Sequence, residues 1–420
     1  MQVVTKPKIF YGWYIVGASL LISAVIGGMT FLGFTALVNP IAAGLGWSYS
    51  QVSLAMSIRG LEAGILSPFL GKLVDRWPAK WLILIGAAII GLGYFILSRV
   101  NSLGIFYLSF MIIALGGSLS VTMAPMTTVA RWFREKLGKA NGIVTMGIGI
   151  GGLSTPIITK LIDTFDWRVA VIILAIVLTA IGIPLAFVFR SRPEDYGLLP
   201  DGEPLSTKDD TDKYADYDFG TSVKEAIKTR TFWHFGIASF CQVAAASAVI
   251  LHVMPYLTML GIERATASMI AMFIPLVSIP ARFTYGWLSD IFPKKYVFAA
   301  SNVLTSIGLF LFSIIGVGSP VTIIAFIMFF GIGLAGVAPL RAPMVREYFG
   351  VKNFGSIFGL TFIFLTLGNV LSPPIAGWVR DLRGVYDPIW LILSGFALLA
   401  AISILTMPSS SKRQTDLLNA

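Results

Sequence analysis

A single cationic side chain, Arg282, stands inside the long apolar stretch that runs from Ser268 to the polar motif Gly286–Lys295. Asp290 marks the polar edge, so Arg282 lies roughly 12 Å deep at about 1.5 Å per helical residue. A lone cation so deep in an apolar helix costs at least about 2.5–3.5 kcal/mol on membrane-insertion scales, and it usually pairs with a negative group. Arginine stays charged and can hold a carboxylate with two parallel hydrogen bonds. We expect Arg282 to bind a substrate carboxylate; the alternative is a structural role with helix-end carbonyls or a protein carboxylate.

Three further side chains could carry protons. Arg59 and Glu62 are three residues apart in another apolar stretch, close enough on one helix face to neutralise each other. This pair either stabilises its helix, or Glu62 titrates during transport as a proton carrier with Arg59 beside it, or Glu62 gates the outer side. His252, followed by Pro255 and Tyr256, could bind substrate, carry a proton near neutral pH or hydrogen-bond a neighbouring helix.

Two groups of residues have supporting roles in this interpretation. Tyr256 is a further candidate for substrate contact, and an apolar wall beside Arg282, or simple core packing, is expected of Phe31, Phe34 and Met146. Carboxylates that approach a neighbouring helix N-terminus and loop arginines could hold one conformation closed. Such gating is expected of Asp75, Arg76, Arg131 and Asp290.

Enzyme chemistry is not indicated. Two distant histidines and one cysteine, Cys241, do not form a common zinc site, and no phosphate-binding GxxxxGK[ST] motif is present. We therefore predict neither a metal nor another cofactor.

Composition identifies the elements that must position these residues. Apolar residues make up 56% of the 420-residue chain and charged residues 12%, whereas a soluble domain has about a quarter charged residues. The net charge of +10 comes from Lys and Arg scattered through short loops, which predicts membrane topology signals and no nucleic-acid partner. The chain is expected to be an all-α protein of the lipid bilayer, because helices are the elements that satisfy their own backbone there.

About 20 residues are needed to span a bilayer, and the sequence contains twelve apolar stretches of suitable length. They lie near residues 10–38, 50–71, 80–98, 103–130, 139–163, 167–189, 231–260, 265–289, 295–316, 319–345, 354–379 and 386–407. Cations are concentrated at the termini and in the even-numbered connections, which places both termini and the 190–230 segment in the cytoplasm. We expect a multi-pass protein of the cytoplasmic, or inner, membrane.

The two halves of the chain repeat each other. The motif Gly71–Lys80 after the second stretch corresponds to Gly286–Lys295 after the eighth, and Phe133 corresponds to Phe349, each at an offset of about 215 residues. We predict a six-helix half at 1–189, a cytoplasmic linker with a short amphipathic helix at 190–230, a second six-helix half at 231–407 and a tail at 408–420. Two repeats with a site between them are typical of secondary transporters.

At these motifs the chain resembles the major facilitator superfamily, and within it the bacterial branch of the monocarboxylate transporter and oxalate/formate antiporter group. The supporting stretches are 10–14, 71–80, 131–142, 192–202 and 252–256. The resemblance implies that Arg282 contacts the substrate carboxylate. Two features differ from the group: Ser278 stands where animal carriers have an aspartate, and 354–376 lacks the lysine of oxalate/formate exchangers. One site cation favours a monoanion.

We expect a monomeric secondary transporter that moves a small organic monocarboxylate, such as lactate or pyruvate, by alternating access together with a proton. The alternatives are exchange of two carboxylates, as in oxalate/formate exchangers, and proton-coupled drug efflux. A carboxylate receptor is not expected because Thr406–Ala420 is short and polar for a signalling tail, and a channel is not expected because the duplicated halves and gate loops suit alternating access better.

Overall fold

The computed structural model describes residues 9–31, 33–152, 154–203, 220–315 and 319–408, and these residues form helices and no β-strand. The first half contains α1 (Gly12–Ile22), the π-helical segment η1 (Ser23–Gly27), α2 (Gly28–Phe31), α3 (Phe34–Leu45), α4 (Tyr49–Arg76), α5 (Ala79–Ser98), α6 (Leu103–Gly117), the π-helical segment η2 (Ser118–Met123), α7 (Ala124–Trp132), α8 (Leu137–Gly151), α9 (Ser154–Phe165) and α10 (Trp167–Ala186).

The connection and the second half follow in the same way. They contain the 3₁₀ turns η3 (Glu194–Tyr196) and η4 (Pro200–Gly202), then α12 (Val223–Lys228), α13 (Arg230–Met259), α14 (Arg264–Ile291), α15 (Lys294–Ser313), α16 (Pro320–Leu334), α17 (Val337–Phe349), α18 (Phe354–Arg383) and α19 (Asp387–Leu405).

Eleven of the described helices are long and apolar enough to cross a membrane. The second stretch of the sequence, now α4, is not among them because it carries Arg59, Glu62, Lys72, Asp75 and Arg76. Its 28 residues nevertheless extend over about 42 Å, and it packs along α18. With α4 as the twelfth span, the predicted all-α membrane fold is confirmed.

Two spans change their winding near the middle. The first passes through η1 and the fourth through η2, and these π-helical segments contact each other. Extra residues inserted into an α-helix in this way are found mainly at functional sites. In this chain η2 also lines a cavity that is described below.

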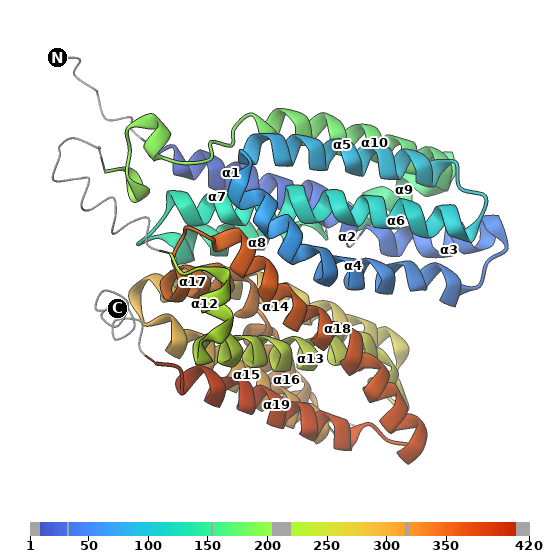
Figure 1. Ribbon diagram of the computed structural model, residues 1–420. Coiled ribbons are helices and arrows are strands. Elements are labelled where there is room, and N and C mark those ends of the chain that lie inside the picture. The colour runs from blue at the N-terminus through green and yellow to red at the C-terminus, as the bar shows by residue number, and fades with distance from the viewer. Residues whose placement is uncertain (1–8, 32, 153, 204–219, 316–318, 409–420) are drawn as a thin grey trace.

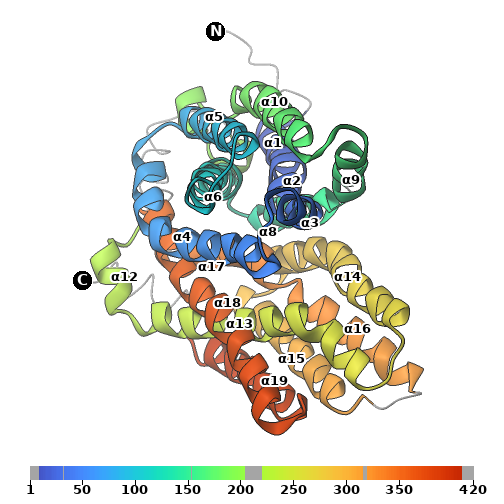
Figure 2. The ribbon, with the colours of Figure 1, turned by 90° about the vertical axis from the view of Figure 1, so that its right-hand side faces the viewer.

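The helices of the two halves meet mainly in two pairs, α4 with α18 and α8 with α14, and α17 packs against α8 and α7 as well. Figure 1 shows the halves close together at the end that carries the linker and farther apart at the other end, and Figure 2 shows α4 and α14 at the boundary between them. We call the first of these ends the linker end.

Glycines allow the close approach at the linker end. A Cβ atom at Gly71 would collide with the backbone of Gly355, and one at Gly286 would collide with the backbone of Gly138. The helices α4 and α14 also end in the same way, α4 at Trp77 before Pro78 and α14 at Phe292 before Pro293. A residue that precedes proline is disfavoured in the α conformation.

Candidate functional site

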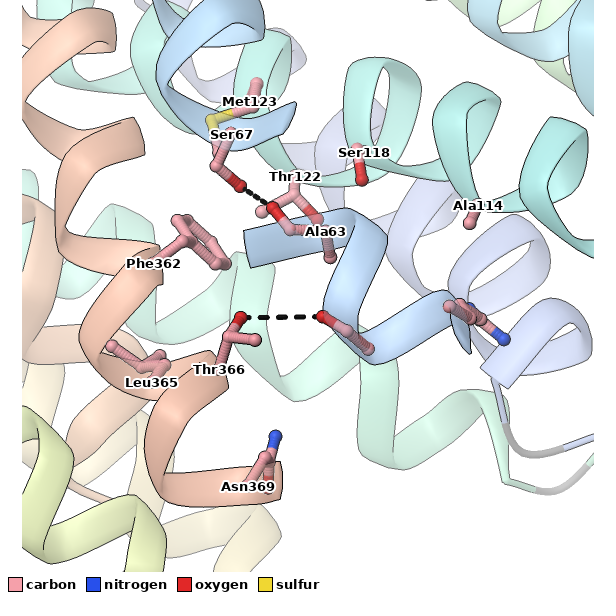
Figure 3. A pocket seen from close by; sticks show the side chains of 12 residues that line it. Ala63, Ser67, Ala114, Ser118, Thr122, Met123, Phe362, Leu365, Thr366 and Asn369 are labelled. Atoms are coloured by element: carbon pink, nitrogen blue, oxygen red, sulfur yellow. Dashed lines mark hydrogen bonds between the residues drawn. The ribbon is translucent and has the colours of Figure 1, made fainter. Parts of the chain in front are cut away.

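A cavity of about 300 Å³ lies between the two halves, bounded by α4, by α6 with η2, and by α18. Figure 3 shows side chains from all three elements around it. The lining residues are Arg59, Gly60, Ala63, Ser67, Ala114, Ser118, Thr122, Met123, Phe362, Leu365, Thr366 and Asn369. Its size is at the lower limit of ligand pockets, about 300–1,000 Å³, and suits a small molecule.

The cavity wall is mainly apolar, with a few polar groups. Ser67 donates its hydroxyl to the carbonyl of Ala63 on its own helix, and Thr366 donates to the Gly60 carbonyl across the half interface at 3.5 Å. The side chains of Ser118, Thr122 and Asn369 add a hydroxyl from each of two turns of η2 and an amide from α18. Such a wall binds an organic body and fixes its orientation at a few points.

Arg59 borders the cavity and is 4% exposed. Its Nη1 donates to the carbonyl oxygen of Thr30 at 2.7 Å, next to the end of α2, where helix carbonyls lack intrahelical partners. Glu62 lies on the same helix, 9% exposed, and its Oε2 is buried without a hydrogen-bond partner among the described residues. The two side chains attract each other electrostatically.

Arg282 reaches across the half interface. Its Nη1 donates to the carbonyl oxygen of Thr145 on α8 at 3.3 Å, and its buried Nε has no hydrogen-bond partner among the described residues. A neutral carbonyl at this distance is a weak partner for a guanidinium compared with a carboxylate. The described residues thus leave the charge of Arg282 without an anionic partner.

Arg341 on α17 is a third buried arginine, although its position five residues before Arg346 would allow a long side chain to extend to the surface. The side chain is instead 6% exposed. Its Nη2 donates to Thr361 Oγ1 at 2.9 Å, and its guanidinium lies 4.1 Å from the ring centre of Phe362 and 4.7 Å from that of Phe358. Since Phe362 lines the cavity, Arg341 stands directly behind the cavity wall.

Positive charge therefore predominates in the middle of the bundle. Of the described residues, the buried charged side chains are Arg59, Glu62 and Arg341, and the partly buried Arg282 adds a third cation. One carboxylate cannot neutralise three guanidinium groups. The remaining charge favours an anion over a cation as the ligand of this region.

His252 and Tyr256 are held inside the second half. His252 Nε2 lies 3.0 Å from the carbonyl oxygen of Pro373, so this nitrogen carries the proton, and Nδ1 lies 3.1 Å from the Tyr386 hydroxyl. Tyr256 is fully buried and donates to the carbonyl of Phe312 at 3.1 Å. Both side chains have their hydrogen-bonding capacity taken up by the protein, and neither lines the cavity.

The expected apolar wall is spread over different places. Phe34 is 2% exposed and packs edge-on against Phe110 at 4.5 Å within the first half. Met146 is partly exposed and follows Thr145, which holds Arg282. The side chain of Phe31 lies outside the described part of the structure.

The two carboxylates expected at the gates, Asp75 and Asp290, each bind the start of a helix from the other half. Asp75 accepts hydrogen bonds of 2.8 Å from the backbone N–H groups of Gly355 and Ser356 and from the Ser356 hydroxyl, and it lies 3.6 Å from Arg131. These N–H groups begin α18, where a carboxylate is favoured by the helix dipole.

Asp290 repeats this arrangement in the opposite direction. It accepts hydrogen bonds from the backbone N–H groups of Gly138 at 2.6 Å and Lys139 at 2.7 Å, at the start of α8. Arg76, the fourth residue expected at the gates, is exposed at the end of α4.

Sequence reasoning did not identify the cavity residues of η2 and α18. A single amide in an apolar run, Asn369, was the available signal, but hydropathy does not tell which helix face it occupies. No cluster of three or more His, Cys, Asp or Glu side chains suited to a metal ion occurs among the described residues.

Comparison with known proteins places this architecture. A family model described as Major Facilitator Superfamily matches residues 19–283 and 236–418. Human Monocarboxylate transporter 11 is 24% identical over 356 residues, which cover 81% of this chain and 71% of that protein. Rat Monocarboxylate transporter 13 is 22% identical over 411 residues, which cover 95% and 89%.

Two solved structures share the fold. FucP, a Major Facilitator Superfamily transporter in the outward conformation, superposes with a TM-score of 0.72 at 16% identity and covers 94% of this chain and 98% of its own. The human organic anion transporter MFSD10 gives 0.72 at 14% identity and covers 94% and 99%.

Proposed function

Since this chain belongs to the Major Facilitator Superfamily, we propose that it is a secondary active transporter of a small organic monocarboxylate and works by alternating access. That it is a membrane transporter and not an enzyme agrees with the prediction from the sequence. The relatives named as monocarboxylate transporters support the substrate class, and the placement in a bacterial branch remains a prediction.

One observation carries this proposal: three arginines lie in the interior of the bundle, and the described residues there supply one carboxylate. An uncompensated charge inside a membrane protein is costly and usually marks the pathway of a charged substrate. A bound carboxylate would neutralise part of this charge in the state where the ligand is closed off from water on both sides. Binding and occlusion would then favour each other.

Arg282 is the residue we assign to the carboxylate. Its bond to the Thr145 carbonyl keeps the guanidinium at the half interface, and a carboxylate could replace that bond with a stronger, charge-assisted one. Arg282 does not line the interface cavity, so we propose that this cavity, which Arg59 borders, holds the organic substrate at another point of its path between the halves. Tyr256, Phe34 and His252 drop out of the proposed contacts because they are engaged elsewhere.

Glu62 is our proposed proton carrier. Its unpartnered carboxylate oxygen can hold a proton, and Arg59 three residues away would stabilise it again once the proton has left. If a proton accompanies a monoanion, transport is electroneutral and follows the pH gradient.

Gating and topology complete the proposal. Asp75 with Arg131, and Asp290, would hold the linker end closed. The concentration of positive residues at this end supports a cytoplasmic location for it and for both termini. The transporter would act as a monomer in the cytoplasmic membrane. The segment 190–230 would join six-helix halves at 1–189 and 231–407, with a cytoplasmic tail at 408–420 that lies, apart from its first residue, outside the described part.

The test is uptake of radiolabelled L-lactate and pyruvate into proteoliposomes, with and without an inward proton gradient. Arg282→Gln should abolish uptake both with and without the proton gradient, because the neutral side chain cannot form an ion pair with a carboxylate. The matched control is Arg380→Gln, an exposed arginine that pairs with its neighbour Asp381. Full activity of the Arg282→Gln protein would overturn the assignment. Uptake that requires internal carboxylate and ignores the proton gradient would identify an exchanger.

A further inference from the structure

The loop between α7 and α8 is held by two carboxylates from different parts of the chain. Asp290 of the second half binds its end, at Gly138 and Lys139. Asp201 of η4 binds its beginning: Oδ2 accepts hydrogen bonds of 2.9 Å from the backbone N–H groups of both Arg134 and Glu135. The linker therefore touches the loop that receives the gate carboxylate of the other half.

The equivalent loop of the second half, between α17 and α18, is bound by the other described part of the linker. The N–H of Thr221 donates to the carbonyl of Phe349 at 2.9 Å, and Asn353 Nδ2 donates to the carbonyl of Thr221 at 3.1 Å. Asp75 binds the end of this loop, at Gly355. Each gate loop is thus held once by a gate carboxylate and once by the linker.

Asp201 also faces a charge of the second half. Arg346, on the last turn of α17, is attracted by Asp201 and Glu194 and repelled by Arg134, and Asp201 acts on it from beyond ion-pair distance. Asp201 Oδ1 and Arg346 Nη1 are both buried and have no hydrogen-bond partner among the described residues. Asp201 also repels Asp290, so attraction to Arg346 must offset this.

The backbone at Asp201 is specialised for this position. Its φ is 64°, a left-handed conformation that few residues other than glycine, asparagine and aspartate adopt readily. The turn aims the carboxylate at the Arg134 and Glu135 N–H groups. A linker that merely connected two halves would not need an aspartate in this turn with one carboxylate oxygen buried.

From this geometry we infer that Asp201 is a third gating residue, a linker latch that holds the α7–α8 loop in the position where the start of α8 binds Asp290 when the linker end is closed. The inference rests on the proposed alternating access. When the halves separate at the linker end, the start of α8 leaves Asp290, and Asp201 also loses the longer-range attraction of Arg346, which moves away with α17. The linker therefore adds to the stability of one transport state.

The test measures thiol accessibility and needs no substrate. The background is Cys241→Ala, which removes the one native cysteine. Two reporters are added separately: Ser289→Cys, 1% exposed at the contact between α14 and α8, and Asn369→Cys, which lines the interface cavity. Labelling rates with a water-soluble maleimide are compared for Asp201, Asp201→Asn and Asp201→Gly. Asp195→Asn, an exposed acid of the same linker, is the control.

Asparagine and glycine both accept the left-handed turn, so neither variant strains the backbone. Removing the charge should raise labelling of Ser289→Cys about tenfold, because charge-assisted hydrogen bonds are roughly twice as strong as neutral ones. Labelling of Asn369→Cys should fall at the same time. Asp201→Asn should also have little further effect in an Arg346→Gln protein if the two side chains act as a pair.

Rates equal to those of Asp195→Asn would overturn the latch, and so would a rise at both reporters, which indicates general loosening. Neither result would contradict the proposed anion transport, which is tested separately by uptake in Arg282→Gln. Loss of uptake in that variant supports the Arg282 assignment, and the expected labelling shifts in the Asp201 variants support the latch. Retained uptake in Arg282→Gln would refute the Arg282 assignment and not the latch.

Discussion

The glycine contacts at the linker end allow a quantitative prediction about the balance of transport states. A Cβ at Gly286 would collide with the carbonyl oxygen of Gly138 and would lie 2.9 Å from the Cα of Gly142. Restoring ordinary carbon contacts of about 3.5–4.0 Å requires α8 and α14 to separate by roughly 1 Å. Gly286→Ala should therefore destabilise the conformation in which this end is closed.

The size of the effect follows from two opposing terms. Overpacking of a tight contact costs typically about 1–3 kcal/mol, and this cost applies when the linker end is closed. Alanine also favours the helix over glycine by roughly 0.5–1 kcal/mol, but this gain is the same in both conformations. The net change should shift the population ratio by about 5–150-fold towards the conformation open at the linker end.

Distances between spin labels in detergent would measure this shift. Labels at Lys72 and Tyr296 report on the linker end, and labels at Ser102 and Arg383 on the opposite end; all four positions are exposed. In Gly286→Ala, the first pair should move apart and the second pair should come closer. Gly17→Ala is the matched control, because a Cβ there meets nothing within 4 Å.

One result would refute the reasoning directly. If Gly286→Ala and Gly17→Ala gave the same distance distributions at both ends, backbone contact between α8 and α14 would not be what holds this end closed. Asp75 and Asp290 alone would then stabilise the conformation in which this end is closed.

The remaining predictions concern two side chains of the interior. Glu62→Gln should remove the stimulation of uptake by a proton gradient while exchange of internal for external substrate continues, because the amide cannot take up a proton; a gradient effect equal to that of the native protein would exclude Glu62 as the carrier. Arg341→Lys should lower the midpoint of thermal unfolding, because it loses ring contacts worth about 0.5–2 kcal/mol each and the planar geometry of the bond to Thr361. Thr361→Val, which removes the hydrogen bond and leaves the ring contacts in place, should have a smaller effect; equal midpoints for the two variants would contradict this account of Arg341.

Part of the contact between the halves at the linker end could be predicted from the chain alone. The repeated motifs at Gly71–Lys80 and Gly286–Lys295 indicated two equivalent acids, Asp75 and Asp290, because duplication preserves spacing. The partners of these acids could not be read in this way. Asp75 and Ser356 are 281 residues apart, and their contact depends on how the two halves dock.

In the interior of the bundle, too, some residues could be identified from the sequence and others could not. Arg282 stood out because an isolated cation in an apolar run is rare and costly. Arg341 did not, since its distance from the polar edge permitted an extended side chain to reach the surface; the rings of Phe358 and Phe362 hold it inside. Tyr256 resembled a site residue in sequence, whereas its hydroxyl is bound within the second half.

The sequence by itself determined the membrane class, the helical architecture, the duplication and the charged residues that are energetically costly inside apolar helices, because length, hydropathy and spacing are properties of the local chain. The tertiary structure alone decided which helix faces meet, and with them the interface cavity, the partner of Arg282 and the position of Asp201 beside the gate loop. Hydropathy records that a side chain lies in an apolar run. The rotation and docking of each helix, set by packing of the whole bundle, decide what that side chain contacts.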